Sequence, residues 1–174
     1  DYTELNMSWE WQDWFDDWQL TIASDGRIFP IVGARGNHEW NNADVYEMFD
    51  TPHPDAYYAL TFGGSLLRAY TLNSESAIPG SQTNWLINDL ITYQNSVEWK
   101  IAQYHRPMRP HVSSKSEGND QYNNWAQPFF DYGVRLVVEC DAHTVKSTWK
   151  VKPSTNISSQ EGFIREDIGG TVYI

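Results

Sequence analysis

The sequence has little of several residue types, and each shortage excludes a class of protein. Cys140 is its only cysteine, so no disulfide forms within the chain, and cysteine usage assigns no cellular compartment. No run of about 18 apolar residues occurs, so we expect no membrane span. Lys and Arg number 12 against 23 Asp and Glu, which gives a formal net charge of -11. A surface this acidic repels nucleic acid, and we expect no nucleic-acid partner.

Aromatic and apolar residues, by contrast, are abundant. Aromatic residues make up 15% of the chain, with 9 Trp among them, and hydrophobic residues make up 40%. This composition excludes a disordered chain. With 174 residues, the chain has enough apolar side chains for the core of one domain and is too short for two. We therefore expect a single domain over residues 1–174.

Segments with helical spacing of apolar residues alternate with short apolar runs. The expected helices cover residues 9–23, 43–49, 82–93 and 122–132. The expected strands cover residues 28–32, 57–62, 66–72, 97–104, 134–138, 145–151, 162–165 and 171–174. Alternation of this kind is typical of an α/β protein, which is the fold class that the sequence predicts.

Polar clusters follow three of the expected strands, those that end at Val32, Tyr104 and Val138. Together the clusters supply Asn37, His38, Glu39, His105, Asp141 and His143. Ligands of open α/β sheets bind at the carboxyl ends of strands, so we expect these side chains to meet at one edge. Imidazole, carboxylate and amide oxygen suit borderline divalent metals. Two such metals, roughly 3.5–4 Å apart, can promote displacement at phosphorus, and their charge would attract a phosphate to an acidic protein.

The order of these clusters resembles the motifs of calcineurin-like metallophosphoesterases. Residues 36–39, Gly-Asn-His-Glu, are similar to the family's Gly-Asn-His-Asp/Glu motif. His105, followed by Arg106 and Pro107, resembles the family's strand-end His before x-Pro, and residues 140–143 stand where the family has Gly-His-x-His. Further segments are similar to the purple acid phosphatase branch, namely residues 57–60, 79–82, 85–86 and 132–134. The likeness covers nearly the whole chain.

This resemblance implies a fold and a reaction. The fold is the family's four-layer α/β/β/α sandwich, which we expect to be incomplete here at the N-terminus and at the C-terminus. The reaction is hydrolysis of a small-molecule phosphate ester, a monoester rather than a diester, by a metal-bound hydroxide at a site with two Fe, Mn or Zn ions. Enzymes of the purple branch are typically exported, so the resemblance also implies a periplasmic or extracellular location.

Individual roles follow from the same resemblance. The implied metal ligands are Asp1, which would bridge both metals, together with Asn37, His105, Asp141 and His143. His38 would contact the substrate, stabilise the transition state or protonate the leaving oxygen, and Glu39 would orient His38 by a hydrogen bond.

The chain departs from the family pattern at three places. Asp141 replaces a histidine that binds the second metal, and a carboxylate favours a harder cation. Glu4 stands where the purple enzymes have a tyrosine, so we expect no purple colour. The family's first motif would precede Asp1, which makes the chain look like a fragment.

Several of these residues also have ordinary structural interpretations. Arg35, Arg106 and His111 could contact phosphate, or the arginines could pair with surface carboxylates in so acidic a chain. Asp141 could cap a turn instead of binding a metal. The sequence leaves these alternatives open.

Two other functions are consistent with the sequence. The missing first motif and Asp141 suit a non-catalytic binding or structural protein that keeps the phosphoesterase fold. The 9 Trp suit a carbohydrate-binding module, which predicts several exposed Trp side chains. The phosphoesterase hypothesis predicts that most are buried, because Trp9, Trp11, Trp14 and Trp18 recur at helical spacing.

Overall fold

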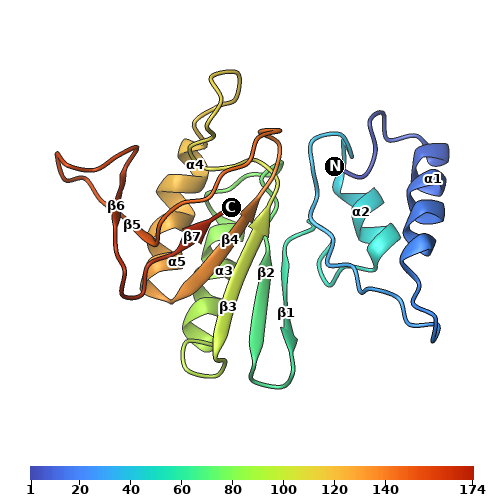
Figure 1. The fold of residues 1–174 in the computed structure, drawn as a ribbon, viewed down its shortest axis with the longest axis horizontal. Coiled ribbons are helices and arrows are strands. Elements are labelled where there is room, and N and C mark those ends of the chain that lie inside the picture. Colours follow the sequence, from blue (N-terminus) through green and yellow to red (C-terminus); the bar gives the residue numbers. More distant parts are fainter.

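Five strands form the main sheet, in the order β1-β2-β3-β4-β7, in the computed structural model, which describes residues 1–174 (Figure 1). They are β1 (Tyr58–Phe62), β2 (Leu67–Thr71), β3 (Trp99–Tyr104), β4 (Val134–Glu139) and β7 (Val172–Tyr173). The hairpin β1-β2 is antiparallel, and every other neighbouring pair is parallel. The carboxyl ends of β2, β3, β4 and β7 therefore share one edge, and the predicted α/β class is confirmed.

One face of the sheet is covered by α3 (Ser81–Thr92) and by a second helical segment. That segment consists of α4 (Asn119–Gln121), a π-helical turn (Tyr122–Ala126) and α5 (Gln127–Asp131). The π turn precedes Pro128, whose ring would clash with the carbonyl of Asn124 in a regular α-helix, so the wider turn accommodates the proline.

Fourteen buried residues form the hydrophobic core between these helices and the sheet. They are Tyr70, Leu72, Ile78, Leu86, Leu90, Ala102, Tyr104, Met108, Trp125, Ala126, Phe129, Val134, Val137 and Tyr173. All of them follow residue 69, so this core is built by residues 70–174, about three fifths of the chain.

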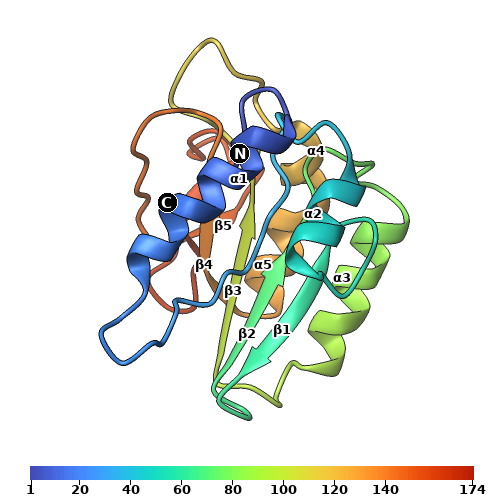
Figure 2. The same cartoon turned by 90° about the vertical axis from the view of Figure 1, so that its right-hand side faces the viewer.

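The N-terminal region lies beside the sheet and contains α1 (Ser8–Trp18), a 3₁₀ turn (Gln19–Thr21) and α2 (Asn42–Phe49). Figure 1 shows it next to β1 and β2, and α1 and α2 face the viewer in Figure 2. Aromatic rings pack it together: the ring centroid of Tyr2 lies 5.5 Å from that of Trp11 and 4.7 Å from that of Phe49.

Two expected strands are not present as predicted. Residues 28–32 form no strand, and Ile28 and Phe29 are 62% and 65% exposed. Pro30, in the middle of this run, has no N–H group to donate to a neighbouring strand. Residues 145–150 are also irregular, and only Val151 belongs to a strand, β5 (Val151–Pro153), which pairs with β6 (Phe163–Arg165) in a separate antiparallel sheet.

The tryptophans are not mostly buried, so that prediction was wrong. Trp11 and Trp125 are buried, whereas Trp9, Trp40, Trp99 and Trp149 are at least half exposed. The four exposed indoles come from different segments, and none of them packs against another aromatic ring. They therefore form no continuous stacking surface for a carbohydrate. In addition, no helix of the structure has the length and apolar character to cross a membrane.

Candidate functional site

His105, which directly follows β3, is the centre of the candidate site. Its Nε2 atom lies 2.8 Å from Asn37 Oδ1, 3.3 Å from Asp1 Oδ2 and 3.6 Å from Asp141 Oδ1. The imidazole is almost completely buried, with 4% of the side chain exposed. Three residues from distant parts of the sequence thus meet at one nitrogen atom of His105: Asn37 and Asp141, as the polar clusters predicted, and Asp1, as the family resemblance implied.

The parallel pairing of β3 with β4 brings two of these residues together. Tyr104 pairs with Glu139 at the carboxyl ends of the strands, and the Cys140 N–H donates to the His105 carbonyl over 3.0 Å. Asp141 then lies in the left-handed region, with φ 57°. An Asp tolerates this conformation better than most residues. Its carboxylate does not cap the turn, because its contacts are with His105 and Lys115.

Glu39 holds the other two residues in place. Its fully buried carboxylate accepts hydrogen bonds from the N–H groups of Tyr2 at 2.6 Å, Thr3 at 3.3 Å and Gly36 at 2.7 Å. Any side chain on Gly36 would collide with the Asp1 carboxylate, so glycine is required there. We expected Glu39 to orient His38 by a hydrogen bond, but it instead ties the Asp1 segment to the loop that carries Asn37.

His38 and His143 are placed differently from the central group. His38 donates its backbone N–H to Asp1 Oδ1 over 3.1 Å, and its ring Nδ1 lies 2.6 Å from the Glu4 carbonyl oxygen. About a third of its side chain is exposed, 34%. His143 is exposed, has a left-handed φ of 53°, and makes no hydrogen bond or ion pair. The structure therefore brings His38 to the edge of the site but does not join His143 to it.

Three cationic side chains surround the group. Lys115 Nζ lies 2.6 Å from Asp141 Oδ1, and Arg106 Nε donates to Glu75 Oε1 over 2.6 Å. Arg35 is buried and donates through Nη1 to Asn42, while its Nε has no hydrogen-bond partner. Burial lowers the pKa of Arg35, and the hydrogen bond to Glu75 raises the pKa of Arg106.

His111 was the third predicted phosphate contact, and it lies elsewhere. It is exposed and lines two cavities near the C-terminal part of the chain, neither of which includes His105. No contact joins it to the central group, so the structure gives it no place among the residues around His105.

Burial changes the protonation of His105. Burial is the main reason why the pKa of the imidazole is lowered to about 4, against the opposing effect of Asp141 and Glu75. The ring is therefore neutral at pH 7 and carries one nitrogen lone pair. This is the form in which histidine binds a metal or accepts a proton.

The donor set suits a metal in its chemistry. Bonds of about 2.0–2.2 Å at tetrahedral or octahedral angles place neighbouring ligand atoms about 3.0–3.5 Å apart, and the three separations from His105 Nε2 are close to that range. However, no group of three or more His, Cys, Asp or Glu side chains is arranged to hold a metal ion. Asn37 contacts His105 Nε2 directly, and the Lys115 ammonium pairs with Asp141. Both contacts would have to break before a metal ion could bind these atoms.

Two residues of the site were not anticipated from the sequence. Lys115 belongs to residues 115–119, whose sequence indicated only a polar loop. Glu75, by contrast, follows β2, whose carboxyl end lies at the same edge as His105, and its side chain is only 8% exposed. The strand-end argument that found His105 and Asp141 could have found Glu75 as well.

No protein-family model matches the chain, and no curated protein matches it either.

Proposed function

We propose that this chain is the catalytic region of a metal-dependent phosphoesterase of the calcineurin-like type, closest to the purple acid phosphatase branch. The proposed reaction is hydrolysis of a small-molecule phosphate ester, a monoester rather than a diester. One observation carries the proposal: Asp1, Asn37 and Asp141 all lie within 3.6 Å of His105 Nε2. These residues occur in the sequence in the order of the family's ligand motifs.

Asp1, Asn37, His105 and Asp141 would hold a metal ion, with Fe, Mn or Zn as candidates. When bound, the ion supplies Lewis acidity and the positive charge that a phosphate requires in an acidic protein. The neutral His105 is already in the protonation state that suits a cation. A second ion would need ligands beyond these four, and His143 is the family's candidate.

The chain's other residues would bind the phosphate and transfer a proton. The Glu4 carbonyl can only accept a hydrogen bond, so a proton on His38 Nδ1 satisfies it and leaves Nε2 free in the neutral ring. From the edge of the site, His38 in its protonated form would donate through Nε2 to a leaving oxygen. Arg35, with its unpartnered Nε, and Arg106 would contribute charge beside Glu75.

We also propose the finer fold assignment, an α/β/β/α sandwich of which the five-stranded sheet is one layer. This is supported by the uneven cover of the sheet. Helices pack on one face, whereas the other face carries an apolar groove of about 300 Å³ lined by residues such as Val32, Phe62 and Ile101. By the same resemblance, the site of action would be periplasmic or extracellular.

Elemental mass spectrometry of the purified chain, together with hydrolysis of an aryl phosphate, tests the proposal. The metal content should fall in His105→Ala, and kcat/KM should drop by at least about a hundredfold, because even outer-shell partners of a metal site contribute 10–100-fold. His53→Ala is the matched control, since His53 is a half-buried histidine of a loop outside the site. Two equivalents of metal support a dinuclear centre, and one supports a site limited to the residues around His105.

The second candidate function is a non-catalytic binding or structural protein with the same fold. The Lys115–Asp141 ion pair favours it, because the ammonium neutralises a ligand that the metal would need. Absence of bound metal after incubation with excess Mn²⁺ or Zn²⁺, with no turnover, would overturn the phosphoesterase proposal in favour of this one.

A further inference from the structure

Two tripeptides of the sequence match the acceptor pattern for N-linked glycosylation, Asn-x-Ser/Thr with x other than proline. They are residues 6–8, Asn-Met-Ser, and residues 156–158, Asn-Ile-Ser. Patterns this short arise often by chance, and the sequence alone does not distinguish the two. A glycan is bulky and hydrophilic, so the folded protein can carry it only on an exposed asparagine whose amide nitrogen is accessible. The structure meets these conditions at one of the two asparagines.

Asn6 uses both ends of its side-chain amide to hold the N-terminal region together. Its Nδ2 group donates to the Asp44 carboxylate, and its Oδ1 accepts a hydrogen bond from Trp11 Nε1 over 3.1 Å. The residue is half-buried, and these two bonds join it to α2 and to α1. A glycan on Nδ2 would crowd the contact with Asp44. The first tripeptide is therefore a part of the fold and a poor acceptor.

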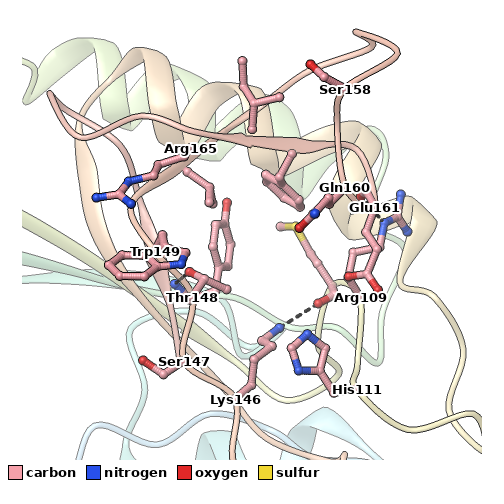
Figure 3. A pocket seen from close by; sticks show the side chains of 15 residues that line it. Arg109, His111, Lys146, Ser147, Thr148, Trp149, Ser158, Gln160, Glu161 and Arg165 are labelled. Atoms are coloured by element: carbon pink, nitrogen blue, oxygen red, sulfur yellow. Dashed lines mark hydrogen bonds between the residues drawn. The ribbon is translucent and has the colours of Figure 1, made fainter.

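Asn156, by contrast, lies in the loop that joins β5 to β6. Residues 155–158 are exposed, and the side chain of Ile157 is entirely in solvent. Figure 1 shows β5 and β6 on the opposite side of the main sheet from the N-terminal region, which supplies Asp1 and Asn37. In Figure 3, Ser158 lies above the other labelled residues, which line a neighbouring cavity. Exposed loop tips with small polar residues tolerate added groups, because no packed side chain is displaced.

The hydrogen bonds of this loop leave the amide nitrogen of Asn156 without a partner. Its Oδ1 accepts from the Ser158 N–H over 3.1 Å and from the Ser158 hydroxyl over 3.2 Å. Its backbone carbonyl accepts from the Ser159 N–H over 2.9 Å. Nδ2 makes no hydrogen bond. A group bonded to Nδ2 would therefore break none of the contacts that shape the loop.

We propose that Asn156 is an N-glycosylation site of the exported chain. Asn156 Nδ2 would form a bond to the anomeric carbon of a lipid-linked oligosaccharide and would lose one proton to a base of the transferase. The bond from that carbon to the lipid diphosphate would break, and its electron pair would leave with the diphosphate. The inference rests on the exported location given under the proposed function, but it uses none of the residues around His105. The glycan would also cover Ile157, an apolar side chain that is otherwise fully exposed.

Secretion of the full chain from insect cells, behind a cleavable secretion signal, tests the inference. The secreted protein should lose mass on treatment with peptide-N-glycosidase, which converts the acceptor asparagine to aspartate, and peptide mass spectrometry should locate that change at Asn156. Asn156→Gln and Ser158→Ala should each abolish the glycan, whereas Ser158→Thr should keep it. Asn95→Gln is the matched control, because Asn95 is also exposed in a turn but has valine two residues later, and this variant should keep the glycan.

Secreted parent protein with an unmodified Asn156, or with its glycan at Asn6 instead, would overturn the proposed site. A glycan that persists in Ser158→Ala would also contradict it, because the acceptor pattern requires the hydroxyl. Hydrolysis of an aryl phosphate is measured on the same samples, and Asn156→Gln should have the kcat/KM of the parent. A glycosylated parent that does not hydrolyse the ester would count against the proposed function alone. An active parent without a glycan would count against the glycosylation site alone.

Discussion

The N-terminal region, residues 1–50, and the sheet region, residues 58–174, are held together in different ways. The sheet region contains the 14-residue core, whereas Trp11 and Val45 are the only buried hydrophobic residues of the first 50. The N-terminal region relies instead on ring contacts and on a buried carboxylate, that of Glu39. Yet the candidate site needs both regions, since Asp1 and Asn37 come from one and His105 and Asp141 from the other. The order of the site therefore depends on the N-terminal region, which has fewer buried hydrophobic residues.

The largest effect is expected from a change in the stronger region. Trp125→Ala removes a fully buried ring from the core and should lower the free energy of unfolding by about 3–5 kcal/mol. Chemical denaturation followed by circular dichroism measures the loss. Trp9→Ala, which removes a mostly exposed ring of α1, should change the stability by less than about 0.5 kcal/mol. Equal losses of unfolding free energy in Trp125→Ala and Trp9→Ala would show that the two regions share one core.

Acid should destabilise the contact between the two regions at His105. The pKa of His105 is lowered to about 4 in the folded protein, against 6.5 for an ordinary histidine, so the unfolded chain binds the extra proton first. The contribution of the neutral His105 to the free energy of unfolding is therefore complete above pH 6.5. It is lost as the pH falls from 6.5 to 4, by about 3 kcal/mol in total. Denaturation of metal-free protein across this range measures the slope. His105→Asn should reduce that slope, and an unchanged slope would assign the acid sensitivity to other groups.

Glu39→Gln should loosen the N-terminal region without unfolding the sheet. The amide would lose the charge that accepts three backbone N–H groups in a buried setting, which should cost about 2 kcal/mol locally. Hydrogen exchange should then accelerate in residues 1–50 and remain slow in β3 and β4. Glu10→Gln is the matched control, because Glu10 also binds backbone N–H groups, but at the surface. Faster exchange throughout both regions would contradict the separation.

The sheet region was also the more predictable from sequence. Strands β2, β3 and β4 were found because their apolar runs are buried against helices, which is the property that an apolar run indicates. The run at 28–32 is also apolar in sequence, but Phe29 is exposed, and composition alone does not reveal burial. Pro30 was the one local signal against a strand, because it removes a backbone donor.

For the site, motif order anticipated which residues meet but not what surrounds them. Asn37, His105 and Asp141 were chosen by their order and by their places after expected strands, whereas Asp1 was chosen from the resemblance to the family alone. The partners of Glu39 are backbone N–H groups, which carry no signature in sequence, so its contacts could not be foreseen. Lys115 reaches Asp141 across 26 residues, and that pairing depends on how a loop folds back.

The smallest expected effect concerns that loop. Lys115→Met removes the ammonium that lies 2.6 Å from Asp141 Oδ1 and frees the carboxylate for a cation. Affinity for Mn²⁺ or Zn²⁺ should rise about tenfold, about 1.4 kcal/mol, as measured by calorimetry with the metal alone. Lys152→Met is the matched control, since Lys152 pairs with Glu166 at 2.7 Å with similar exposure but away from the site. An equal increase in Lys115→Met and in the control would mean that only the overall charge of the chain matters, and that Lys115 does not compete with a metal for Asp141.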